Sequence, residues 1–123
     1  MFFLNSINES KIREKSTTIS DVANVLYAYS VFLAYKNENN EELIEFFDSS
    51  EIALIAPDED ILTFNIHWLI SKNKLISEEV CIAINLIING FEYGIQNSIH
   101  RGIFILYQYL FDQNFSIGSH SIN

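Results

Sequence analysis

Apolar residues recur at helical spacing in several stretches of the chain, and capping residues stand where these stretches begin. Ser20 is a good N-cap, and Asp21 suits the positive start of a helix. The apolar stripe that follows comprises Val22, Val25, Leu26, Tyr29, Phe32 and Leu33. Ser77 marks another start, and Asn89 with Gly90 marks a helix end. The pattern predicts helices over 20–36, 40–48, 77–89 and 98–112, with a weaker signal at 9–15.

The segment from Glu51 to Ile70 fits two structures. Leu62, Phe64, Ile66 and Trp68 alternate with polar residues, which is a strand period and favours a small β-hairpin at 52–69 around Pro57. Asp58 or Asp60 is also a fair N-cap, and acidic first turns favour helices. Because every neighbouring segment is helical, we expect a helix here.

The last two predicted helices are apolar almost all round. Helices of this kind are usually buried, so we expect an antiparallel pair at the centre, wrapped by the earlier helices. The chain then forms an all-α, compact helical bundle. We expect a single helical domain over 1–112 and a flexible C-terminal tail over 113–123, because the tail is polar.

Composition limits the class of protein. The chain has 123 residues, of which 49% are hydrophobic, and this is enough for one core without covalent cross-links. Cys81 is the only cysteine, so a reducing compartment is the simpler interpretation. The apolar start is too short for a signal peptide, and polar residues interrupt every apolar stretch before it reaches the length of a membrane span. We expect a cytoplasmic protein that does not enter the membrane.

No sequence motif of a catalytic or metal site occurs. The chain has no glycine-rich phosphate loop, nucleophile elbow, CxxC or HExxH. Cys81 lies between Val80 and Ile82 and is expected to be a small core residue. His67 adjoins Trp68 in an apolar run and is expected in or beside the core. We therefore expect that the protein is not an enzyme and that it needs no metal or organic cofactor.

A run without lysine or arginine extends from Asn37 to Ser71. The net charge of the chain is −9, and nine of its 16 acidic residues fall in this run. They are Glu38, Glu41, Glu42, Glu45, Asp48, Glu51, Asp58, Glu59 and Asp60. Such a charge repels phosphate backbones and disfavours nucleic acid, whereas it suits a basic partner or simple solubility.

Within this run, the predicted helix 40–48 has acidic residues on one side and apolar residues on the other. Glu41, Glu45 and Asp48 share one side, at i, i+4 and i+7. The other side, expected to face the core, comprises Leu43, Ile44 and Phe47. We therefore expect residues 38–60 to form the surface that meets a basic protein partner, although a merely solvated surface explains the pattern equally well.

A second candidate surface lies on helix 20–36, opposite its main apolar stripe. It carries Tyr27, Val31 and Tyr35. Tyrosines are frequent interface anchors, but these side chains would pack equally well beneath another helix.

The profile as a whole is short, acidic, rich in Asn and Ile, and free of catalytic motifs. In these respects it resembles bacterial immunity proteins, including those paired with contact-dependent growth inhibition toxins. The resemblance implies tight binding to a toxin domain, often a nuclease with a basic cleft, which the acidic stretch would cover. It includes no motif, so it implies no residue roles. Two alternatives are an acidic nucleic-acid mimic that inhibits a nuclease or defence effector, and a self-associating regulatory helical protein, which should expose an apolar stripe.

Overall fold

Five helices make up the part of the chain that can be described. The computed structural model describes the backbone of residues 2–36 and 41–115, and the side chains of 18–36, 41 and 43–115. The helices are α1 (Phe2–Lys36), α2 (Glu42–Ile55), α3 (Glu59–Ser71), α4 (Glu78–Tyr93) and α5 (Gln96–Asp112). These ranges contain no strand, so the all-α class is confirmed. None of the described helices has the length and apolar character needed to cross a membrane.

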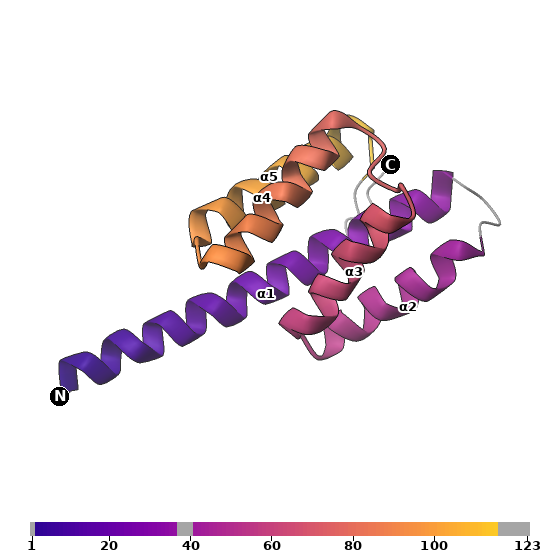
Figure 1. Ribbon diagram of the computed structural model, residues 1–123. Helices are drawn as coiled ribbons and strands as arrows, with labels where there is room; N and C mark the ends of the chain where they lie inside the picture. Colours follow the sequence, from indigo (N-terminus) through magenta and orange to yellow (C-terminus); the bar gives the residue numbers. More distant parts are fainter. Residues whose placement is uncertain (1, 37–40, 116–123) are drawn as a thin grey trace.

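The long helix α1 packs against two helical hairpins (Figure 1), which also contact each other through α3 and α4. The α2–α3 hairpin packs on one side of it, and α5 of the α4–α5 hairpin packs on the other. The first half of α1 extends beyond this body. Because no proline or glycine precedes Pro57, nothing interrupts α1 before its end. Ser20 therefore lies inside α1 and does not cap a helix, contrary to the sequence prediction.

The core lies between α1 and the two hairpins. The predicted apolar stripe of α1 is buried in full: Val22, Val25, Leu26, Tyr29, Phe32 and Leu33. From α2 and α3, the rings of Phe46 and Trp68 stack with their centroids 5.2 Å apart. Tyr29 joins the core to the loop before α4, since its hydroxyl donates to the carbonyl of Lys74 and accepts from the N–H of Ile76.

The ambiguous segment is helical, and the β-hairpin at 52–69 does not form. Helix α2 continues to Ile55, and α3 begins after Asp58. The Asp58 carboxylate caps α3 by accepting the N–H groups of Asp60 at 2.7 Å and Ile61 at 3.3 Å. The alternation of apolar residues was misleading because the buried set has a helical period. That set is Leu62, Asn65, Ile66, Trp68 and Leu69, while Phe64 is half exposed.

Helices α4 and α5 form the expected pair, but their bounds and surroundings differ from the prediction. Helix α4 passes through Gly90 and ends at Gly94, which adopts the left-handed conformation with φ 67°. Gly90 is needed inside the helix because a Cβ there would meet the side chain of Ile99. The pair is not wrapped by the other helices. Its outer side exposes large apolar side chains, among them Ile82, Phe104 and Phe111.

The end of the described chain turns back onto α1. Phe115 packs against Phe32, with ring centroids 5.3 Å apart, and against Tyr35 at 6.3 Å. Residues 113–115 thus include a side chain in contact with the body. The rest of the predicted tail, 116–123, lies outside the described residues.

Candidate interaction surface

One side of α2 carries both acidic and isoleucine side chains. We call it the α2 outer face, and it consists of Glu41, Ile44, Glu45, Asp48, Glu51, Ile52 and Ile55. All seven are exposed, at helical spacing. The opposite side of the helix is held against α1 and α3 by Leu43, Phe46, Ser50 and Ala53, which are all buried. The packing of α2 therefore fixes which residues face outward.

The position of Ile44 corrects the sequence prediction. Leu43, Ile44 and Phe47 were expected to face the core, but Ile44 is 60% exposed and Phe46 takes the core position. Phe47 lies at the edge, with its ring centroid 5.2 Å from that of Tyr27. The error arose because the helix was predicted to end at residue 48. Over its full length to Ile55, the small buried residues Ser50 and Ala53 set the inner face.

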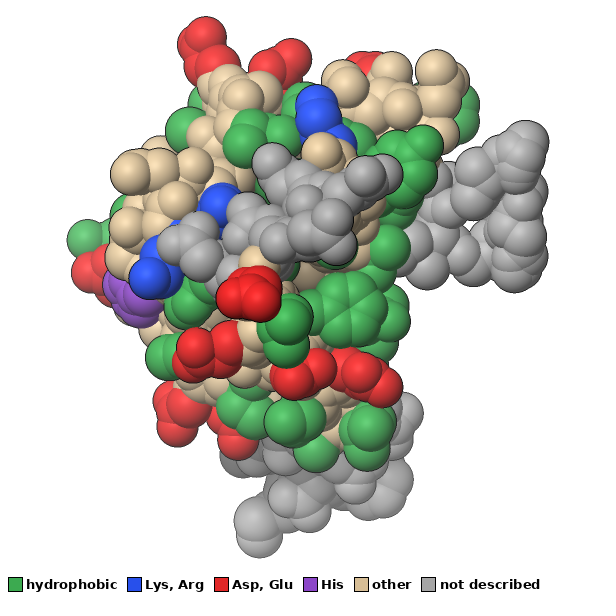
Figure 2. Space-filling model, turned by 90° about the vertical axis from the view of Figure 1, so that its right-hand side faces the viewer, with side chains coloured by type: hydrophobic (Ala, Val, Ile, Leu, Met, Phe, Trp, Pro, Cys, Tyr) green, Lys and Arg blue, Asp and Glu red, His purple; other side chains and the backbone are tan. Residues whose placement is uncertain are grey.

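Within the described part of the chain, no cation is paired with the carboxylates of the α2 outer face. The sequence has no lysine or arginine from 37 to 71. Among the described residues, no side-chain hydrogen bond or ion pair engages the carboxylates of Glu45, Asp48 or Glu51. At 1.5 Å per residue, successive acids among Glu41, Glu45, Asp48 and Glu51 are about 4.5–6 Å apart along the axis, which is less than the Debye length of about 8 Å, so the fields of neighbouring acids overlap. Figure 2 looks onto the side where α2 lies in Figure 1 and shows acidic side chains gathered there with hydrophobic ones between them.

A shallow pocket of about 270 Å³ lies beside this face, between α2 and α3. Ile52 and Phe64 supply its apolar walls, and Asp60 contributes a carboxylate at its rim. Phe64 is 50% exposed, and Ile52 is 54% exposed. An apolar side chain of a partner would fit between them, so the surface offers shape as well as charge.

The nine acidic residues that were predicted to form one binding surface lie in different parts of the structure. Glu41, Glu45, Asp48 and Glu51 lie together on α2, and Asp60 lies nearby on α3. Asp58 serves as the N-cap of α3. Glu59 is half-buried and lines a different hollow, between α3 and α4. Glu38 and the side chain of Glu42 lie outside the described residues.

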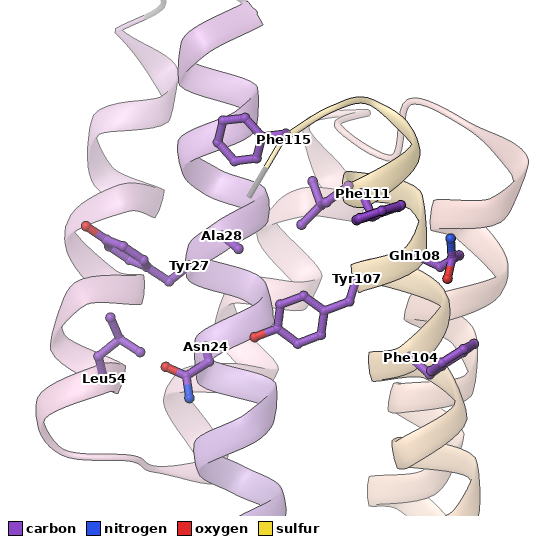
Figure 3. A pocket seen from close by; sticks show the side chains of 10 residues that line it. Asn24, Tyr27, Ala28, Leu54, Phe104, Tyr107, Gln108, Phe111 and Phe115 are labelled. Atoms are coloured by element: carbon purple, nitrogen blue, oxygen red, sulfur yellow. The ribbon is translucent and has the colours of Figure 1, made fainter. Parts of the chain in front are cut away.

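The larger hollow is an aromatic groove of about 580 Å³ that lies over α1, between Leu54 of α2 and the side chains of α5 (Figure 3). Tyr107 points across it toward Asn24 on α1, and Phe104, Gln108 and Phe111 also line it from α5. Tyr27 lines the groove while packing on Phe47 of α2, so this tyrosine packs largely beneath another helix. Tyr35 at the other end of the second candidate surface is 73% exposed.

The remaining polar groups show structural roles. Thr18 is buried and donates to Gln96 Oε1 at 2.7 Å, and its Oγ1 lies 3.5 Å from Nε2 of His100. His67 is exposed on α3, not buried as expected, because the helix turns Ile66 and Trp68 inward instead. Cys81 Sγ, half-buried, lies 3.9 Å from the carbonyl of Leu75. In the described ranges, no three His, Cys, Asp or Glu side chains form a group that could hold a metal ion.

Comparison of the chain with protein-family models, with curated proteins and with solved structures finds no match in any of the three.

Proposed function

We propose that the protein binds and neutralises a basic protein partner through the α2 outer face, and that this partner is a bacterial toxin domain. The observation that carries the proposal is that four carboxylates and three exposed isoleucines share one helical face. A surface needed only for solubility gains nothing from Ile44 at 60% exposure or Ile55 at 80%.

The two kinds of side chain serve different steps of binding. Closely spaced carboxylates steer a basic partner and raise the association rate, an effect that salt weakens. Isoleucines lose their contact with water only in the complex, so they slow dissociation. The isoleucines among the acids of the α2 outer face argue against a nucleic-acid mimic, which would carry an unbroken ridge of acids in place of phosphates.

The test begins with the gene next to the one that encodes this chain. If it encodes a toxin domain with a basic surface, the two proteins are produced together, and cell survival is measured. The triple change Glu41→Lys, Glu45→Lys and Asp48→Lys should abolish protection. It should also lower the association rate of the purified proteins by at least about tenfold at low salt, within the range of electrostatic steering.

A matched control changes the charge by the same amount on the other hairpin. Glu78, Glu79 and Glu92 are exposed on α4, and changing all three to Lys should leave protection intact. Circular dichroism checks that both triple variants remain folded, since Glu78 and Glu79 also favour the start of α4. If the two triple variants bind equally well, the acids of α2 are solvated surface only.

The isoleucines have their own test. Ile52→Ser combined with Ile55→Ser should raise the dissociation rate while leaving the association rate nearly unchanged. Ile82→Ser on α4, which is 47% exposed, is the control for losing an exposed isoleucine elsewhere. Equal dissociation rates for the α2 variant and the wild type would exclude Ile52 and Ile55 from the interface.

A further inference from the structure

A second exposed apolar surface lies on α5, the helix that packs on the other side of α1 from α2 (Figure 1). We call it the α5 outer face, and it consists of Asn97, Arg101, Phe104, Gln108, Phe111 and Asp112. These residues are exposed opposite the buried side of the helix, which comprises Ile99, Gly102, Ile103, Leu106 and Leu110. Phe104 is 67% exposed and Phe111 is 71% exposed. Tyr107, at 43%, flanks them above the aromatic groove.

The size of this apolar surface suits an interface. With about 200 Å² for an aromatic side chain, the three exposed fractions correspond to about 350 Å² of aromatic surface. This is as large as the largest apolar patch of a typical monomer, and such patches are often functional. A standard interface uses roughly 800 Å² per partner, and the polar residues around the aromatic rings would supply the rest.

The charges on the α5 outer face indicate what covers it. Arg101 stands near the start of α5 and Asp112 at its end, so the face has one charge of each sign. A strongly basic partner would not complement a face with one positive and one negative charge. A second copy of the same face would complement it if the two α5 helices ran antiparallel. With the twofold axis near Tyr107 and Gln108, Arg101 lies opposite Asp112 of the second copy, and Phe104 lies opposite Phe111.

We propose that the protein forms a symmetric dimer in which α5 packs antiparallel against α5 of a second copy. The same residues then contribute from both sides, as a twofold interface requires. Two Phe104–Phe111 contacts form its centre, and two Arg101–Asp112 ion pairs lie toward its ends. Gln108, which donates to Asp112 Oδ1 at 3.1 Å within each chain, holds that carboxylate in place.

The first test is sedimentation equilibrium of the full chain from micromolar to millimolar concentration. We expect the mass to rise from that of one chain to that of two. Phe104→Ser and Phe111→Ser should each weaken dimerisation by about tenfold or more, because each removes two aromatic contacts from the centre. Ile55→Ser on α2 should leave dimerisation unchanged. A single-chain mass throughout, or unchanged dimerisation of the phenylalanine variants, would overturn the proposal.

Charge reversal tests the direction of packing. Arg101→Asp alone should weaken the dimer, because it places two carboxylates opposite each other at both ends. Adding Asp112→Arg should restore dimerisation toward the wild-type level, since the pairs are then formed with reversed signs. If the double variant dimerises no better than the single variant, the antiparallel arrangement is wrong.

Cross-linking tests the position of the axis. In a Cys81→Ser background, Gln108→Cys should give a disulfide-linked dimer when a mild oxidant is added. Asn97→Cys should not, because two copies of position 97 would lie about 30 Å apart along the axis at 1.5 Å per residue. Equal cross-linking at both positions would contradict the proposed register.

Discussion

Replacing Gly102 with alanine sets two physical effects against each other. Gly102 lies inside α5, where alanine is a better helix former than glycine by about 1 kcal/mol. Helix propensity alone therefore predicts a more stable protein. However, a Cβ at this position would lie 2.5 Å from the carbonyl oxygen of Ala83 and 2.7 Å from Cγ1 of Ile87, both on α4. The two helices approach each other more closely here than a methyl group allows.

The magnitude follows from the size of the overlap. Ordinary contact with a Cβ begins at 3.4 Å, so α4 and α5 would have to separate by about 0.9 Å at this point. The obstacle is backbone, which has no other rotamer to adopt. We therefore place the strain at the upper end of the usual range for overpacking, about 3 kcal/mol. After the gain in helix propensity, Gly102→Ala should destabilise the protein by about 2 kcal/mol and lower its Tm by roughly 5–10 °C.

The measurement is urea and thermal unfolding followed by circular dichroism at the helical band. Asn85→Ala, at an exposed position of α4, is the matched control and should be neutral or slightly stabilising through propensity alone. A Gly102→Ala variant as stable as the wild type, or more stable, would refute the close approach of α4 and α5 at this residue.

Two further predictions concern the buried tyrosine. Tyr29→Phe should lower the free energy of unfolding by about 1–2 kcal/mol in urea titrations, because the carbonyl of Lys74 and the N–H of Ile76 each lose their bond to its hydroxyl; an unchanged midpoint would contradict this role. Burial raises the pKa of Tyr29 well above its ordinary value, and the pKa values of Tyr107 and Tyr109 are raised by burial as well. The folded protein therefore holds protons that the unfolded chain releases above about pH 10, so stability should be fully present below that pH and fall as the pH rises. Urea midpoints across this range should fall less steeply for Tyr29→Phe than for the wild type, and equal slopes would argue against this assignment.

Local signals in the sequence were sufficient for the class of the fold and for most helices. The stripe of α1 was correctly predicted because its period is helical and its six members are all large. Ser77 was correctly identified as the N-cap of α4, where its Oγ accepts the N–H of Val80 at 3.2 Å. Asp58 was one of two candidates for the N-cap of α3 and proved to be the cap.

Errors occurred where tertiary packing decided the outcome. Gly90 has the local signature of a helix end, but its role is to let Ile99 approach α4, and Gly94 ends the helix four residues later. Ser98 marked the predicted start of α5, yet its Oγ donates to the carbonyl of Leu86 and the helix begins at Gln96. These roles depend on contacts with the neighbouring helix, and the local sequence pattern carries no information on those contacts.

The candidate surface was predictable in its charge but not in its apolar part. The run without lysine or arginine is visible in the sequence and drew attention to Glu41, Glu45 and Asp48. The sequence pattern groups Ile44 with Leu43 and Phe47 on the core side, and Ile52, although within the predicted surface 38–60, has no local signal that singles it out. Only the full length of α2 shows that both residues share the exposed side with the acids.

The two proposed interfaces are compatible with each other because α1 lies between them. Helices α2 and α5 pack on opposite sides of that helix (Figure 1), and the α2 outer face and the α5 outer face share no residue. A dimer formed through α5 therefore leaves both α2 outer faces open, so it should bind two basic partners rather than one. A partner with one basic surface would bind each α2 outer face of the dimer as tightly as it binds the monomer. Only a partner that presents two basic surfaces would bind the dimer more tightly than the monomer. Titration of the partner into the wild type and into Phe104→Ser should thus give the same dissociation constant per chain. A lower affinity for the monomeric variant would mean that the partner contacts both copies, and that the two interfaces are parts of one site.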